Sequence, residues 1–173
     1  MDFFLEEYDD FLADLNEIWG NFIHKYNFEV SKSGEGIFRL ENDSTMLYII
    51  IGGDSKIGYV FENPQTGVRY EEINLFLFFG KKSKSPTFFD EEYPISKTEW
   101  LEMYQEENFR GICRIDLPIV LNEIESEWLN LVNGNYSFEA DFNAWRKWKI
   151  SEKNKKTPAD KLSFEAYLKD TDS

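Results

Sequence analysis

The sequence predicts an α+β fold, with an N-terminal helix, an antiparallel meander of about five strands, and C-terminal helices packed on one face of the sheet. Three observations predict it. Apolar residues recur every three or four positions through residues 3–26, short alternating segments separated by turn sequences fill residues 28–80, and helical spacing returns after residue 96. A chain of 173 residues is expected to form one compact domain. We assign residues 1–150 to that domain and residues 151–173 to a Lys-rich segment with a short C-terminal helix, docked or partly frayed.

The first predicted helix, over residues 3–26, carries a broad apolar stripe. The residues of that stripe are Phe4, Tyr8, Phe11, Leu15, Ile18, Phe22 and Tyr26. Four acidic residues fall on the opposite side: Glu6, Asp10, Asp14 and Glu17. This division indicates a helix with one face toward a core and an acidic face toward solvent.

The meander is predicted from alternating apolar residues between turns rich in Gly, Asn and Asp. The expected strands cover residues 28–33, 37–41, 46–51, a fourth marked by Ile57, Tyr59 and Phe61, and a fifth within 68–79. Residues 46–51 are apolar on both faces, which predicts a central strand. In the fifth strand Ile73, Leu75, Leu77 and Phe79 are expected to share a face.

The second half of the chain is expected to be mainly helical. Ser96, with Glu99 three residues later, predicts a capped helix start. Residues 110–115 are read as a short strand or an irregular link. Pro118 is placed in the first turn of a helix that runs to about residue 133, where Gly134 supplies the stop. A further helix carries Phe138, Phe142, Trp145 and Trp148, and a last short one is expected over residues 159–168.

Charge is the most informative feature of the composition. The chain has 33 Asp and Glu against 19 Lys and Arg, a formal net charge of −14. A surface of that sign repels nucleic acids and anionic lipids and attracts basic proteins, so we expect neither nucleic-acid nor membrane binding. Solubility alone is the other explanation of the same charge. The aromatic share of 17% is high enough to supply both a core and rings on a binding face.

No pattern of catalytic, cofactor-binding or metal-binding residues emerges. His24 is the only histidine and Cys113 the only cysteine, so a zinc site lacks its usual ligands and Cys113 has only His24 as a possible base. A lone cysteine is most often buried and inert. Carboxylate pairs such as Glu6/Asp10 and Glu123/Glu127 are expected by chance among so many acids. Residues 52–56 contain two glycines but lack the Gly-Lys-Ser/Thr ending of a phosphate-binding loop. We therefore predict a protein that is not an enzyme and that uses no cofactor.

A cytoplasmic location is expected from three features of the sequence. A single cysteine excludes an intrachain disulfide. The first residues lack the basic and apolar regions of a signal peptide, and no apolar run approaches the ~20 residues that span a bilayer.

Basic residues form two local clusters. They are Lys81, Lys82 and Lys84, and then Arg146, Lys147, Lys149, Lys153, Lys155 and Lys156 beside Trp145 and Trp148. A basic helix with aromatic rings can bind single-stranded nucleic acid. The net charge of the chain outweighs this reading, which we keep as the minor one.

Residues 90–107 are the strongest candidate for a binding site. They contain seven acids and one base, Lys97. The acids are Asp90, Glu91, Glu92, Glu99, Glu102, Glu106 and Glu107, and the rings within or beside them are Phe88, Phe89, Tyr93, Trp100 and Tyr104. Rings inside an acidic rim provide apolar anchors together with carboxylates that steer and pair Arg or Lys of a basic partner. Glu6, Asp10, Asp14 and Glu17 of the first helix form a secondary candidate. A loop and a helix whose rings pack inward would give the same pattern.

In this combination of small size, acidity, many aromatic residues and no catalytic set, the chain resembles the immunity proteins of bacterial polymorphic toxin systems. The resemblance is one of class and is carried by no residue motif. It implies a non-catalytic inhibitor that binds and occludes a cognate basic toxin domain, such as a nuclease. One alternative is a small-molecule-binding protein or enzyme with a pocket between sheet and helices that uses carboxylates such as Glu62 or Glu72. A second is a structural or regulatory subunit of a larger complex.

Overall fold

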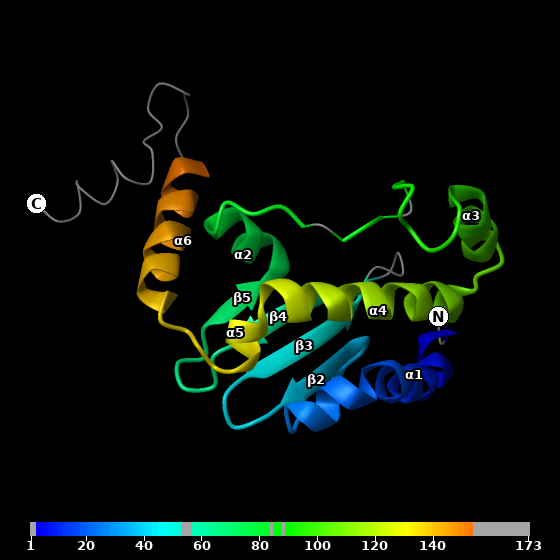
Figure 1. The fold of residues 1–173 in the computed structure, drawn as a ribbon, viewed down its shortest axis with the longest axis horizontal. Coiled ribbons are helices and arrows are strands. Elements are labelled where there is room, and N and C mark those ends of the chain that lie inside the picture. The colour runs from blue at the N-terminus through cyan, green and yellow to red at the C-terminus, as the bar shows by residue number, and fades with distance from the viewer. Residues whose placement is uncertain (1–2, 53–56, 84, 88, 154–173) are drawn as a thin grey trace, which may run out of the picture. The chain divides into compact units, whose positions relative to one another are not determined.

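The computed structural model describes residues 3–52, 57–83, 85–87 and 89–153, and it confirms the predicted α+β order. A long N-terminal helix is followed by a five-stranded antiparallel meander and then by helices (Figure 1). The chain divides into two compact units, Met1–Asn135 and Tyr136–Ser173. The division therefore falls before the last described helix, whereas we had expected a boundary at residue 150.

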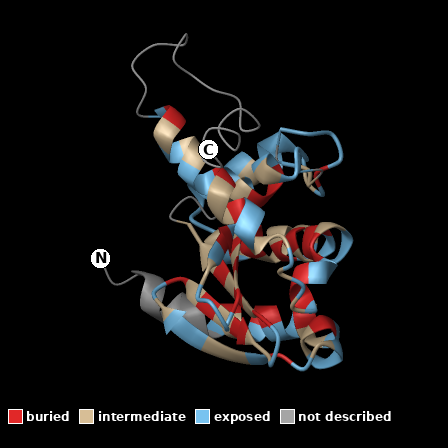
Figure 2. Ribbon diagram, turned by 90° about the vertical axis from the view of Figure 1, so that its left-hand side faces the viewer, coloured by how far each residue is buried: buried red, intermediate tan, exposed pale blue. Residues whose placement is uncertain are grey.

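The sheet matches the predicted strands closely. Its strands are β1 (Glu29–Gly34), β2 (Ile37–Glu41), β3 (Met46–Ile51), β4 (Ile57–Glu62) and β5 (Arg69–Glu71), paired in sequence order. The strand that is apolar on both faces, β3, lies at the centre as predicted. Buried and half-buried residues alternate along β2, β3 and β4, so one face of the sheet carries the core (Figure 2).

Helix α1 (Phe3–Lys25) and helix α4 (Phe109–Glu127) complete this core. The ring of Phe11 on α1 packs 4.8 Å from that of Phe38 on β2. The indole N–H of the fully buried Trp19 donates to the carbonyl of Leu117 on α4, at 3.0 Å. Aromatic rings fill much of this core, because many of the largest fully buried side chains in the first unit are aromatic: Trp19, Trp128, Tyr59, Tyr70, Phe38 and Phe61.

The prediction of a long fifth strand is wrong in its second half. Strand β5 ends at Glu71, and helix α2 (Glu72–Phe78) follows at once. The helix buries Leu75 and Phe76 and exposes Ile73 and Leu77, a division that fits helical spacing. A short apolar run of Leu and Phe fits either period, and Leu is a strong helix former.

The prediction of a strand or irregular link over residues 110–115 is also wrong, because these residues form the start of α4. The side-chain oxygen of Asn108 caps the helix by accepting from the backbone N–H of Gly111, at 3.0 Å. Pro118 lies inside α4 and not in its first turn.

The last helices of the first unit end close to the predicted position. Helix α4 stops at Glu127, and the short α5 (Leu129–Val132) follows. Gly134 then takes a positive φ of 73°, as the predicted stop requires. A side chain there would also collide with Ser44, whose Cβ lies 2.8 Å from the position of a Cβ on residue 134.

Helix α6 (Glu139–Lys153) is the described part of the second unit. It extends through the start of the stretch that we had assigned to a Lys-rich segment from residue 151. The predicted helix over residues 159–168 lies outside the described residues. None of the helices in the described part of the chain is both long enough and apolar enough to cross a membrane.

Candidate functional site

The predicted binding region forms one continuous exposed stretch. We call residues 90–107 the acidic segment; it comprises a loop, helix α3 (Lys97–Gln105) and the turn at residues 106 and 107. All seven of its acids are exposed: Asp90, Glu91, Glu92, Glu99, Glu102, Glu106 and Glu107. In the part of the chain that the structure describes, none of the seven forms an ion pair.

Local hydrogen bonds fix the shape of the acidic segment. Ser96 and Glu99 form the predicted capping box, in which each side chain accepts from the backbone N–H of the other residue. These bonds lower the pKa of Glu99. The Asp90 carboxylate accepts from the backbone and the hydroxyl of Thr87, which lowers its pKa as well. Both carboxylates therefore stay ionised while they shape the backbone.

The rings of this region are divided between surface and interior. Phe89 is 69% exposed and Tyr104 is 40% exposed, and the ring of Trp100 stacks on that of Tyr104 at 5.2 Å. Leu101 is exposed as well. Tyr93, which we had placed at the binding surface, is buried, and its hydroxyl donates to Asp116 at 2.7 Å. Phe88 lies outside the described residues.

Helix α3 contributes no residue to the core, since none of its side chains is buried. It is held at its end by a close approach to α4: a Cβ on Gly111 would collide with the side chain of Met103. Between the two helices Glu107 takes a positive φ of 57°. The helix therefore stands on the surface with an apolar strip, Leu101 and Tyr104, among its carboxylates.

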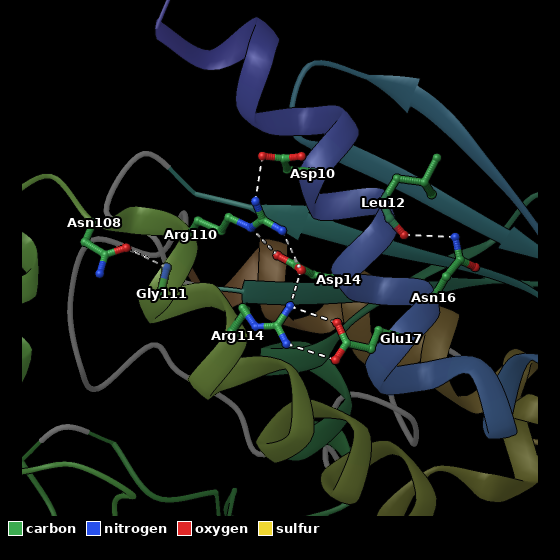
Figure 3. Close-up of polar contacts among 9 residues, drawn as sticks. All are labelled: Asp10, Leu12, Asp14, Asn16, Glu17, Asn108, Arg110, Gly111 and Arg114. Carbon is green, nitrogen blue, oxygen red and sulfur yellow. Dashed lines mark hydrogen bonds and ion pairs between the residues drawn. The ribbon is translucent and has the colours of Figure 1, made fainter.

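The secondary candidate on α1 is engaged within the chain. Arg110 and Arg114 reach from α4 to the carboxylates of Asp10, Asp14 and Glu17 (Figure 3). Arg110 bonds Asp14 at 2.8 Å and Asp10 at 2.6 Å, and Arg114 bonds Glu17 at 3.0 Å and also Asp14. The side chain of Glu6 lies outside the described part of the structure. We call the five described residues the ion-pair ridge.

Asp14 is the buried centre of the ion-pair ridge, with 1% of its surface exposed. Burial alone would raise the pKa of Asp14. The hydrogen bonds and charges of Arg110 and Arg114 outweigh it and hold the pKa below its usual value. The ridge therefore joins α1 to α4 and belongs to the fold.

A cavity of about 390 Å³ lies beside the acidic segment, within the first compact unit. Its walls come from β4, α2, α3, α4 and the loop before α3. The polar lining residues are Glu72, Ser83, Ser85, Thr87, Asp116 and Glu123, and the rings are Phe89, Tyr93 and Trp100. All three rings belong to the region predicted to bind a partner, so the cavity adjoins that surface.

Glu123 is the best-bonded acid of the cavity. It is buried, and its carboxylate accepts from the hydroxyls of Tyr59 at 2.7 Å, of Ser85 at 2.7 Å and of Ser83. Tyr59 in turn accepts from the indole N–H of Trp128 at 2.8 Å. These bonds attach the loop before α3 to the helix–sheet core.

Glu72 differs from Glu123 in having no such partners. It is half-buried on α2 and forms no hydrogen bond or ion pair with any described residue. Burial, together with the negative charge of Glu123, raises the pKa of Glu72 to about 7. Burial also raises the pKa of Asp116, although the hydrogen bond from Tyr93 acts in the opposite direction.

The other residues considered as catalytic or metal-binding candidates are buried, exposed singly, or paired with another side chain. Cys113 is buried and His24 is exposed on α1. Glu127 pairs with Lys81 at 2.8 Å, and Glu62 pairs with Arg69 at 2.6 Å. Within the described residues, no group of three or more His, Cys, Asp or Glu side chains is arranged to hold a metal ion.

The sequence pointed to Glu72 as a pocket residue, but Asp116 was missed and Glu123 was set aside as part of a chance carboxylate pair. The two lie seven residues apart on α4 and share its apolar stripe with Ile112 and Val120. Acids at helical spacing inside an apolar stripe are the signal that could have found them, because a buried helix face rarely carries unpaired charge.

Comparisons of the chain with protein-family models, with curated proteins and with solved structures found no match. The two features of the structure that bear on function are the acidic segment and the cavity beside it.

Proposed function

We propose that this chain is a non-catalytic inhibitor of the immunity-protein type, which uses its acidic segment to bind and cover a basic protein such as a toxin domain. The observation that carries the proposal is a helix with no fully buried side chain. Helix α3, the loop before it and the turn after it present seven carboxylates, none of them ion-paired to a described residue, around the exposed Phe89, Leu101 and Tyr104.

The chemistry of this surface favours a cationic protein as the occupant. Carboxylates that lack in-chain partners can pair with Arg or Lys across an interface and speed the encounter. The exposed rings and Leu101 provide apolar area, which carries most of the affinity at the centre of an interface. A nucleic acid or an anionic membrane would be repelled by the same carboxylates.

The ion-pair ridge has no part in this proposal, although its acids were the secondary candidates. Arg110 and Arg114 already neutralise Asp10, Asp14 and Glu17. The proposed binding surface for the partner therefore consists of the acidic segment alone.

The test is recovery of the partner with a matched pair of charge variants. The tagged chain is expressed in its native host, and the bound proteins are identified after washes of rising salt. One variant carries Glu102→Lys and Glu106→Lys. The control carries the same change of charge at the exposed Glu29 and Glu35, outside the acidic segment.

We expect the wild type and the control to retain one basic protein, which is lost from the acidic-segment variant and released by salt because the pairing is electrostatic. Inhibition of that protein's activity by the wild-type chain completes the test. The proposal is overturned if the acidic-segment variant retains the same proteins as the wild type, or if the chain is recovered alone.

A second candidate function is the binding of a small molecule, and the cavity is the observation that favours it. A volume of about 390 Å³ lies within the range of small-ligand sites. Recovery of the chain alone with a bound metabolite would support this function instead.

A further inference from the structure

The charges that line the cavity are all of one sign. Glu72 enters from α2, and Asp116 and Glu123 enter from α4. No lysine, arginine or histidine stands among the described residues that line it. The cavity therefore has a negative potential that the described walls do not balance.

Apart from the hydroxyl groups of Ser83, Ser85 and Thr87, the remaining walls are apolar. Ile57 on β4 and Ile112, Ile119 and Val120 on α4 form them, together with the rings of Phe89, Tyr93 and Trp100. Aromatic faces attract organic cations, and aliphatic walls accommodate the alkyl stem that carries such a cation. An inorganic ion would gain little from these walls.

The carboxyl groups of the cavity are not equally satisfied. Glu123 accepts from three hydroxyl groups, whereas Glu72 has no hydrogen bond or ion pair within the described structure. Two acids that repel each other in a partly desolvated space disfavour ionisation of one of them. A cation placed beside Glu72 would remove that penalty.

We infer that the cavity binds an alkylammonium or guanidinium group, with its charge paired to Glu72 and its stem along the apolar and aromatic walls. This inference rests on the proposed function for the source of the cation, an Arg or Lys side chain of the basic partner. Phe89 and Trp100 line the cavity beside the acidic segment, so a side chain from a bound partner has a short path into it. A free small amine offers the same chemistry.

The experiment uses the chain alone, so it does not depend on finding the partner. N-acetylarginine amide, agmatine and N-acetylcitrulline amide are titrated in turn, and binding is measured by calorimetry. The indole N–H signal of Trp100, assigned with the Trp100→Phe variant, reports on occupancy in NMR spectra. Citrulline is the matched control because it keeps the shape of arginine and lacks the charge.

Three variants locate the site. Glu72→Gln is expected to weaken binding about tenfold, since the side chain keeps an acceptor oxygen but loses the negative charge that pairs with the cation. Asp116→Asn keeps an acceptor for Tyr93 and is expected to weaken binding less. Glu71→Gln is the matched control: it lies one residue away, outside the cavity, and keeps an oxygen for Asn74. Circular dichroism checks that all three are folded.

Saturable binding of the arginine amide that is lost with citrulline and weakened by Glu72→Gln supports the inference. Tighter binding of the arginine amide than of agmatine indicates a protein side chain as the source, and the reverse order indicates a free amine. Equal binding of citrulline, an unchanged affinity in Glu72→Gln, or no saturation overturns it. Failure of this experiment can be told apart from failure of the proposed function. The cavity is tested with small cations and Glu72→Gln, whereas the proposed function is tested by partner recovery with Glu102→Lys and Glu106→Lys.

Discussion

The ion-pair ridge and the acidic segment look alike in sequence, but the fold uses them differently. Each is a helical region dense in carboxylates. On α1, Asp10, Asp14 and Glu17 face α4 and are bound by its two arginines. In the acidic segment, the carboxylates are exposed and none forms an ion pair with a described residue.

The difference lies in what the neighbouring element presents. Arg110 and Arg114 are four residues apart, so they share one face of α4, and that face lies against α1. The first turns of α4 meet α3 through Gly111 and Met103, whereas both arginines of α4 are turned to the carboxylates of α1. Whether an acidic stretch holds a fold together or remains available for a partner is therefore decided by tertiary pairing.

The largest effect is expected from Asp14, which lies at the centre of the ion-pair ridge. Asp14→Ala removes a buried acceptor of two arginines and should lower the free energy of unfolding by about 2–3 kcal/mol. Asp10→Ala, at an exposed pair, should cost about 0.5 kcal/mol. Chemical denaturation measures both. Similar losses in the two variants would show that the ridge does not depend on its buried member.

Because the pKa of Asp14 is lowered, the stability that this residue contributes depends on pH. The folded state holds the ionised carboxylate, so its contribution to stability is present above the ordinary pKa and is lost as pH falls through the lowered one. Glu72 acts in the opposite direction, because its pKa is raised.

The second effect concerns Glu72. Its pKa of about 7 in the folded state lies above the ordinary value of 4.5, so its contribution to stability is complete below pH 4.5 and is lost as pH rises through about 7. The neighbouring titratable groups are Glu123 and Tyr59. Glu72→Gln should remove this slope and stabilise the chain at pH 8 by about 1–2 kcal/mol.

Thermal denaturation between pH 5 and pH 8 measures the slope, with Glu71→Gln as the control that should retain it. An unchanged slope in Glu72→Gln would mean that this carboxyl is well solvated. The electrostatic part of the cation inference would then be lost.

The local spacing of apolar residues in the sequence was sufficient to predict the first helix and the central strands. Helix α1 and strand β2 follow their predicted ranges closely because their apolar spacing fits one period, and β3 does so because turn residues bound its apolar run on both sides. Helix α2 and the start of α4 were missed. In the first case Leu and Phe fit two periods, and in the second the helix start was placed at Pro118, whereas the helix begins at Phe109, directly after its cap Asn108.

The candidate site was predictable only in part. Its exposed carboxylates could be located from composition, and Ser96 and Glu99 from the capping pattern. Tyr93 is bound by Asp116, and Asp14 is bound by Arg110 and Arg114. These partners are distant in sequence, so local sequence patterns do not reveal the contacts. The cavity is formed from four elements and a loop, and no single stretch of sequence describes it.

A third effect tests whether the backbone conformation of Glu107, in the turn that ends the acidic segment, lowers the stability of the fold. Glu107 has a positive φ of 57°, a conformation that favours glycine. Glu107→Gly should raise the free energy of unfolding by about 0.5–1 kcal/mol while removing one carboxylate. Glu106→Gly is the control, since its φ of −81° gives no such relief and the change should destabilise. A loss of stability in both variants would show that the turn is unstrained.

The smallest effect gives the most direct distinction between the two acidic regions. Glu17→Lys breaks a pair with Arg114 and should lower the free energy of unfolding by about 0.5–1 kcal/mol. Glu102→Lys on α3 should change it by less than about 0.5 kcal/mol, in either direction, because no in-chain partner is lost. Thermal melting of the two variants side by side at low salt makes the measurement. If Glu102→Lys destabilises the chain as much as Glu17→Lys does, the acidic segment has partners within the chain, and its carboxylates are not free to bind another protein.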